Sequence, residues 1–346
     1  MSLNDAFVNF DGLKHIITNE IIQNLTLKNI ITIFTEPINL AYRLLSFLSF
    51  SIIFKFFGAN PFYFHLLSLL VHLFNIYLVY RWMIVWTKHS AAAIIISVLF
   101  EIHPLHVESV SWVSALNDVL YGCFSLLALI SYTKYLQKSR TNKYLIITAI
   151  WFITTCLSKT LAIILSAIFL LLNRYFTASM SQMNKLSQKI PFLLIRLLFA
   201  YVSLWAKNEI SSKISNITNL YGFSDRVFFA FYGIQFYFTK LLLPFGLSAF
   251  HAFPLKTRGS LPTQLYSSPV FTLILIAILY FAKLFRKELI FGFLFFFINI
   301  ALVIQIISFG ETVIAERYTY ILYIGLFFCS FSFQPNSNLG KRLNNV

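Results

Sequence analysis

Charged side chains are scarce in this chain of 346 residues, because Asp, Glu, Lys and Arg together make up only 11% of it. A soluble domain carries roughly 25%. Here 58% of residues are hydrophobic and the mean hydropathy is +0.76. These values exclude an ordinary water-soluble protein. The apolar residues form runs that approach the roughly 20 needed for a membrane-spanning helix, and lipid-exposed backbone must satisfy its own hydrogen bonds. The sequence therefore predicts an all-α, polytopic helical bundle in a membrane.

Cysteine is also rare, and its three positions, Cys123, Cys156 and Cys329, lack the spacing of a metal site. We interpret them as small core residues. The formal net charge of +15 comes from Lys and Arg between apolar runs and not from a long basic tract. This distribution is typical of membrane topology signals and argues against nucleic acid as a partner.

Nine apolar runs predict membrane helices, and they cover residues 64–84, 91–104, 117–135, 144–157, 160–173, 190–206, 269–285, 289–308 and 318–333. Two further runs, 40–57 and 228–247, contain internal cations, so we expect them to re-enter or to lie along the interface. With both kept outside, the inner loops hold 14 basic residues and one acid, Glu288, while 11 of the 12 acids lie on the outer side. Basic loops indicate the cytoplasmic face.

This orientation predicts one transmembrane domain over residues 1–346. Its expected parts are an outer loop (1–63), an N-terminal helix bundle (64–206), a second outer loop with a re-entrant or interfacial segment (207–268), C-terminal helices (269–333) and a cytoplasmic tail (334–346).

Polar residues cluster most densely in the outer segment that reads His103-Pro-Leu-His106-Val-Glu108, and Asp118 follows at the start of the next helix. Imidazole and carboxylate groups could ligate a metal. The same groups also build ordinary hydrogen-bonded loops, and no fourth ligand stands at a fixed spacing. Pro104 favours a structured hairpin under either interpretation.

Three other outer sites, the last of them a pair of adjacent residues, have both a structural and a functional interpretation. Asp11 is a turn or cap residue, or it is a catalytic carboxylate. Lys159, at a turn between two short helices, extends to the interface or clamps an anion. The adjacent charges of Glu316 and Arg317 neutralise each other, or the planar Arg317 guanidinium binds phosphate.

Together these motifs resemble the membrane part of the transmembrane and TPR-containing O-mannosyltransferases, in the form of their bacterial relatives without TPR repeats. The most specific string is HPLHVESVSWV, beginning at His103. Supporting matches, in the same order as in the family, are FVNFD ending at Asp11, NLTLKNI at 24–30, LSK ending at Lys159 and ERYTY beginning at Glu316.

The resemblance implies the fold of a C-type glycosyltransferase, with about 9 to 11 membrane helices and interfacial helices in the first outer loop. It implies that a mannose-like hexose moves, with inversion, from a polyprenyl-phosphate donor to an acceptor hydroxyl. Asp11 would be the catalytic base, and Lys159 and Arg317 would bind the donor phosphate. The remaining pocket residues would be His103, His106, Glu108, Asp118, Glu316 and Tyr318.

The expected partners are a polyprenyl-phosphate-linked sugar, a protein or glycan acceptor and membrane lipid. No cofactor is predicted, although a divalent metal stays open. The expected location is the bacterial inner membrane, with the active site on the extracytoplasmic side.

Two alternatives to an active transferase stay open. Gly12 and Leu116 stand where the family usually has an acid and an Arg. They leave room for a non-catalytic or decayed relative that binds a lipid-linked sugar or assists a partner. A lipid or sugar transporter would instead place ionisable residues near the membrane midplane. Among the nine runs predicted to span the membrane, only Arg196 lies well inside one.

Overall fold

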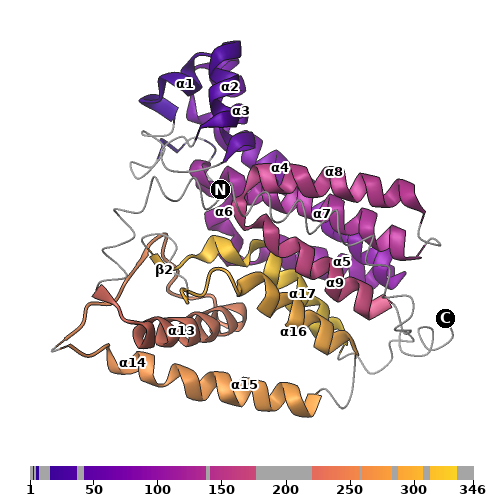
Figure 1. Cartoon of the computed structure of the whole chain (residues 1–346), viewed down its shortest axis with the longest axis vertical. Coiled ribbons are helices and arrows are strands. Elements are labelled where there is room, and N and C mark those ends of the chain that lie inside the picture. The colour runs from indigo at the N-terminus through magenta and orange to yellow at the C-terminus, as the bar shows by residue number, and fades with distance from the viewer. Residues whose placement is uncertain are drawn as a thin grey trace. The chain divides into compact units, whose positions relative to one another are not determined.

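The computed structural model describes residues 3, 5–7, 16–36, 43–137, 141–176, 220–257, 259–282, 287–306 and 312–332. Within these ranges the regular structure is almost entirely helical, with one two-stranded sheet (Figure 1). This confirms the predicted helical class. The predicted helix at 190–206, the tail at 334–346 and the candidate base Asp11 lie outside the described residues.

The chain divides into two compact units, each made of two separate stretches. The first unit comprises Met1–Leu78 and His106–Ser212, and the second comprises Val79–Leu105 and Lys213–Val346. Their dividing points fall within helix α4 (Pro61–Thr87) and inside the HPLH motif.

The first unit contains a group of short helices followed by longer ones. They are α1 (Glu20–Gln23), α2 (Leu27–Thr35), α3 (Leu44–Phe57), the first part of α4, α6 (Val107–Ser111), η3 (Val113–Ala115), α7 (Leu116–Gln137), α8 (Asn142–Ser158), η4 (Thr160–Ile164) and α9 (Leu165–Phe176). Asn19 and Thr26 cap α1 and α2, because their side-chain oxygens accept hydrogen bonds from first-turn backbone N–H groups. These caps explain why two such short helices begin where they do.

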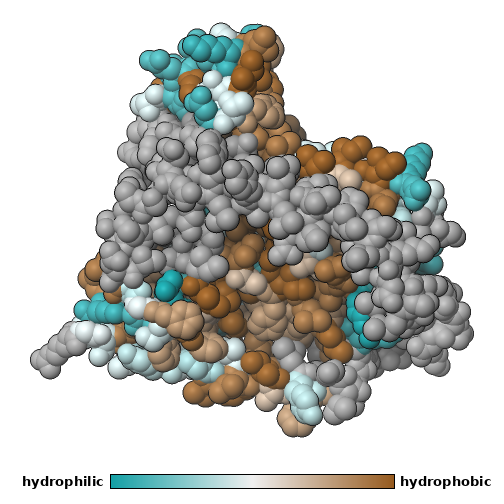
Figure 2. All heavy atoms as spheres, in the orientation of Figure 1, coloured by the Kyte–Doolittle hydropathy of each residue, from teal (hydrophilic) through white to brown (hydrophobic). Residues whose placement is uncertain are grey.

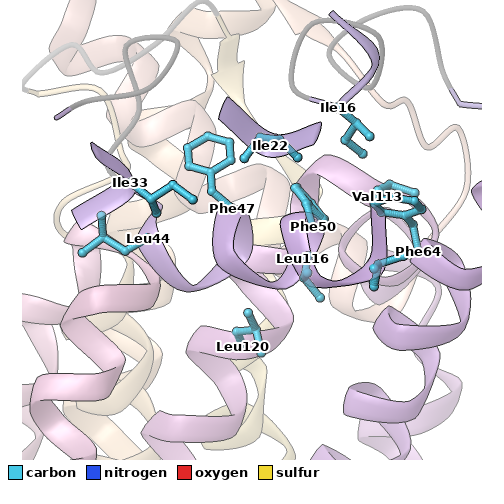
Figure 3. Close-up of a cluster of buried hydrophobic side chains, with 11 residues drawn as sticks. Ile16, Ile22, Ile33, Leu44, Phe47, Phe50, Phe64, Val113, Leu116 and Leu120 are labelled. Carbon is cyan, nitrogen blue, oxygen red and sulfur yellow. The ribbon is translucent and has the colours of Figure 1, made fainter. Parts of the chain in front are cut away.

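A cluster of buried apolar side chains fixes the short helices against the start of α7 (Figure 3). Ile22 from α1, Ile33 from α2 and Phe47 from α3 belong to it, and so do Leu116 and Leu120 at the start of α7. Burying an apolar side chain of this size stabilises a fold by about 1.5–3 kcal/mol. The first turns of α7, which carry Asp118, are therefore firmly positioned.

Helix α7 packs side by side with α8 (Figure 1), and α9 also contacts it. Ring contacts join the three helices, since Phe169 of α9 lies 4.6 Å from Tyr132 of α7 and 5.8 Å from Phe152 of α8, measured between ring centroids. The side chain of Asn75 on α4 donates to the backbone oxygen of Val119 at 2.8 Å. A polar tie of this kind orients α7 within an apolar core.

The second unit contains the remainder of α4 and the C-terminal helices. Its other elements are α5 (Ser90–Ile102), α13 (Phe223–Leu242), β1 (His251–Ala252), α14 (Thr263–Tyr266), α15 (Ser268–Ala282), α16 (Lys287–Ile300), β2 (Thr312–Ile314), η6 (Glu316–Tyr318) and α17 (Thr319–Ser332). Strands β1 and β2 pair antiparallel, with His251 opposite Ile314. The pairing brings the loop after α13 to the segment that leads into α17.

Helices α16 and α17 lie side by side (Figure 1), and their backbones approach closely at two glycines. A Cβ atom on Gly292 would lie 2.3 Å from the backbone oxygen of Gly325, and one on Gly325 would lie 2.7 Å from that of Gly292. Small residues allow such close approach between apolar helices. The sequence supplies glycine at both positions.

Two described helices, Pro61–Thr87 and Val113–Gln137, are long and apolar enough to cross a membrane. A third span results if Ser90–Ile102 and Pro104–Ser111, bent by 58°, count as one. The visible face carries large hydrophobic areas (Figure 2). On α15, several side chains are more than half exposed, as expected of a surface that faces lipid: Val270, Leu273, Ile274 and Ile278. The chain therefore has the features of a membrane protein, and the other predicted spans stay predictions.

The boundaries of several predicted helices differ from those of the structure. α4 extends beyond the predicted 64–84, and α16 ends at Ile300 although the predicted helix runs to 308. The run at 160–173 begins as the 3₁₀ helix η4 before α9. Hydropathy marks apolar runs, but the ends of a helix depend on caps and packing that hydropathy does not register.

Candidate functional site

An ion pair joins two of the predicted site residues in the first unit, because the ammonium group of Lys159 donates to Oδ1 of Asp118. The Asp118 side chain is only 3% exposed and that of Lys159 is 12% exposed. Lys159 Nζ also lies 5.8 Å from the centroid of the Tyr121 ring. A carboxylate this deeply buried requires a partner, since an uncompensated charge is costly away from water.

Local structure places both members of the pair at helix ends. Asp118 lies in the first turn of α7, where the positive end of the helix dipole favours a carboxylate. Lys159 is the C-cap of α8, and its backbone N–H donates to the Thr155 oxygen at 3.1 Å. Because α7 and α8 pack along their lengths, the start of one meets the end of the other.

Two more predicted residues, His106 and Glu108, are buried in the same unit, at the start of the short helix α6. At the end of this helix the backbone N–H of Trp112 donates to the backbone carbonyl oxygen of Glu108 at 3.2 Å. The guanidinium of Arg43 donates to the backbone oxygen of Ser114 at 3.3 Å. The HPLHVESVSWV string is therefore folded into short helical turns that lead directly into α7.

A second buried carboxylate, Glu316, lies in the second unit and has a 5% exposed side chain. The backbone N–H of Ser248 donates to its Oε1 at 2.7 Å, and Nε2 of His251 lies 3.3 Å from the same oxygen. A carboxylate can only accept hydrogen bonds, so the imidazole carries a proton at Nε2 when this bond forms. The two donors come from the loop that follows α13.

The backbone around Glu316 is fixed from both sides. The Thr319 hydroxyl donates to the Glu316 carbonyl oxygen at 2.7 Å. The phenol oxygen of Tyr237 donates to the carbonyl oxygen of Ala315 at 3.0 Å and lies 3.3 Å from its N–H. The Tyr323 hydroxyl in turn donates to the Tyr237 carbonyl at 2.6 Å. Hydrogen bonds from α13 and α17 thus hold the backbone that carries the Glu316 side chain.

His103 belongs to this second unit as well. Its Nε2 lies 3.3 Å from the Leu241 oxygen, and its Nδ1 accepts from the Leu105 N–H at 3.3 Å. Its ring meets those of Tyr323 and Phe327, with centroids at 4.9 Å and 5.7 Å. Both nitrogens thus bind backbone groups, an arrangement that favours ordering the HPLH turn over direct contact with a substrate.

Arg317 and Tyr318 follow Glu316 in η6 and are both half-buried. The guanidinium carbon of Arg317 lies 5.3 Å from the Tyr318 ring centroid, a cation–π distance. Among the described residues, no three His, Cys, Asp or Glu side chains converge where they could hold a metal ion. The roles assigned to the site residues by resemblance stay predictions.

His251 is the residue that sequence reasoning missed. It is the single histidine within the predicted outer loop 207–268, and Glu316 adjoins another predicted outer segment. Their predicted location on the same side of the membrane was the only available signal, because 65 residues separate the two side chains in the sequence. Their contact depends on the pairing of β1 with β2.

Part of the chain is similar to mammalian O-mannosyl-transferases. "Protein O-mannosyl-transferase TMTC1" of Homo sapiens is 34% identical over 99 residues, which make up 28% of this chain and 11% of that protein. The protein of the same name in Mus musculus is 35% identical over 99 residues, 28% of this chain and 10% of that protein. The match thus covers about a tenth of each relative's length. No family model and no solved structure matches the chain.

Proposed function

We propose that this chain is a membrane glycosyltransferase that moves a mannose-like hexose from a polyprenyl-phosphate donor to an acceptor hydroxyl on the extracytoplasmic side. The partial similarity to two O-mannosyl-transferases carries the proposal. The helices of membrane-spanning length support it, because a donor with a polyprenyl chain resides in a membrane. The acceptor is a protein or a glycan.

In the proposed reaction the acceptor oxygen attacks the anomeric carbon of the sugar. Asp11 takes the hydroxyl proton as the carbon–oxygen bond to the donor phosphate breaks. The polyprenyl phosphate leaves with the bonding electron pair, and the anomeric configuration inverts. The leaving phosphate gains negative charge, so a cation held in a partly dry site stabilises it.

Lys159 is the cation that we assign to this phosphate in the first unit. Its present partner is the Asp118 carboxylate, so a lipid phosphate would have to share or displace that ion pair. A Lys159→Gln change should therefore raise the KM for the donor. Arg317 has a planar guanidinium group that suits phosphate oxygens. The KM of the Arg317→Gln variant for the donor is measured separately.

The experiment uses membranes that contain the full-length protein, radiolabelled polyprenyl-phosphate mannose and a panel of Ser/Thr peptides and glycans. The unmodified protein should transfer label to an acceptor, and Asp11→Asn should abolish transfer. The matched control is Asp5→Asn, which removes an exposed acid from the same stretch of sequence that has no assigned role and should leave transfer intact. Undiminished transfer by Asp11→Asn would refute the assigned base, and no transfer by the unmodified protein would refute the activity.

Two observations favour a second candidate, a non-catalytic relative that binds a lipid-linked sugar. The Asp118–Lys159 ion pair already satisfies the proposed phosphate-binding cation, and Gly12 and Leu116 depart from the family pattern. This candidate predicts saturable binding of polyprenyl-phosphate mannose without turnover in the same membranes. Any acceptor-dependent release of polyprenyl phosphate would exclude it.

A further inference from the structure

The contact between His251 and Glu316 has a defined geometry that none of the roles above uses. His251 lies on β1 opposite Ile314 of β2, and Glu316 follows β2 by two residues. The imidazole ring packs edge to face on Phe236, with centroids 5.0 Å apart. Strand pairing and ring packing therefore fix the imidazole relative to the carboxylate, and neither depends on a long flexible side chain.

Both hydrogen bonds that the Glu316 carboxylate accepts from described residues fall on one oxygen, Oε1. The Ser248 N–H and the His251 Nε2 share that oxygen, which fixes the rotation of the carboxylate. An ionised carboxylate has about four lone-pair sites over its two oxygens. Oε2 is thus the oxygen through which the group would accept a hydrogen bond from a ligand.

We infer that His251 is a positioning residue for Glu316, and that it holds Oε1 so that Oε2 accepts a hydrogen bond from a hydroxyl of the lipid-linked sugar. The sugar class rests on the proposed function. His251 itself need not touch the sugar. Its effect is to prevent the carboxylate from turning, because a preorganised acceptor binds a hydroxyl more selectively than a mobile one.

A purely structural role for His251 would be to tie the loop after α13 to the rest of the second unit. The same loop contains another tie, in which Lys256 Nζ lies 2.6 Å from Oδ2 of Asp225 at the start of α13. Breaking that ion pair loosens the loop without touching Glu316. Lys256→Gln is therefore the matched control for any change at His251.

The experiment measures equilibrium binding of polyprenyl-phosphate mannose and of its monodeoxy analogues to the purified full-length protein. The unmodified protein should bind one deoxy analogue about 10- to 100-fold more weakly than the parent, which is the effect of losing a hydrogen bond to a charged group. His251→Ala should reduce this discrimination to about twofold or less. His251→Gln should retain most of it, because its amide nitrogen can donate from nearly the same place as Nε2.

The control Lys256→Gln should discriminate as the unmodified protein does. The inference is wrong if the unmodified protein shows no preference for the parent, if His251→Ala keeps the preference, or if Lys256→Gln loses it equally. Because the readout is binding, it is independent of turnover. Selective binding without transfer would overturn the proposed activity and leave this inference intact, whereas transfer without the His251 effect would do the reverse.

Discussion

Replacing Lys159 with Met tests how much the buried ion pair of the first unit contributes to stability. The substitution keeps an unbranched side chain of similar length but leaves the 3% exposed carboxylate of Asp118 without its cation. Removing one partner of a buried pair costs about 3–5 kcal/mol. The dipole at the N-terminus of α7 still stabilises the unpaired carboxylate by up to about 1 kcal/mol. We therefore expect the free energy of unfolding to fall by about 2–5 kcal/mol.

The reciprocal change, Asp118→Asn, should cost less, about 1–2 kcal/mol. The flexible Lys159 stem is already 12% exposed and can carry its charge toward water, whereas Asp118 is short and fixed on α7. In the double variant, Asp118→Asn with Lys159→Met, no buried charge is left. Its stability should lie within about 1 kcal/mol of the unmodified protein.

The assay is equilibrium unfolding of the full-length protein by SDS in mixed detergent micelles. Lys143→Met is the matched control, because Lys143 is an exposed lysine of α8 and its loss should change stability by less than about 0.5 kcal/mol. A Lys159→Met variant as stable as this control would show that the ion pair contributes nothing. Simple addition of the two single losses in the double variant would refute the coupling.

Other predictions concern helix packing and orientation. Gly292→Ala should cost about 1–3 kcal/mol or more in the same assay, because its Cβ would lie 2.3 Å from a backbone oxygen. The control Gly233→Ala, with its nearest neighbour at 4.0 Å, should be neutral or stabilising, and equal losses would contradict the packing argument. A membrane-impermeant maleimide should label Thr263→Cys but not Thr141→Cys on intact cells. Both side chains are exposed in the structure, but Thr263 lies in a predicted outer loop and Thr141 in a predicted inner loop. The buried native cysteines should stay unlabelled until the protein unfolds. Labelling of Thr141→Cys but not of Thr263→Cys would show that the orientation is opposite to the predicted one.

Sequence patterns predicted the helical class and the longest apolar helices, since hydropathy and helix length are local properties. α4 and α7 were both expected from apolar runs, and the structure gives them membrane-spanning length. The same patterns singled out Asp118 and Lys159 separately, as a carboxylate and a cation at helix ends. They did not predict that the two would bind each other across 41 residues.

The contact between the two glycines of α16 and α17 is another feature that sequence patterns did not predict. Gly292 and Gly325 each look like an ordinary residue of an apolar run, because neither has a positive φ that would require glycine. Their need for glycine arises from the approach of α16 to α17, where a Cβ on Gly292 would also meet the Cys329 sulfur at 2.2 Å. The sequence of either helix alone does not show how closely the two helices approach each other.

By itself the sequence determined the apolar, membrane-type composition of this protein, its helices and the kinds of side chain in its predicted outer motifs. Those features follow from composition and from neighbours a few residues apart. Only the tertiary structure decided which ionisable side chains meet, for example Asp118 with Lys159 and Glu316 with His251. The reason is that such a contact requires two side chains within about 4 Å, and this separation is set by the path of the chain between them. That path also selected His251, which no motif had marked.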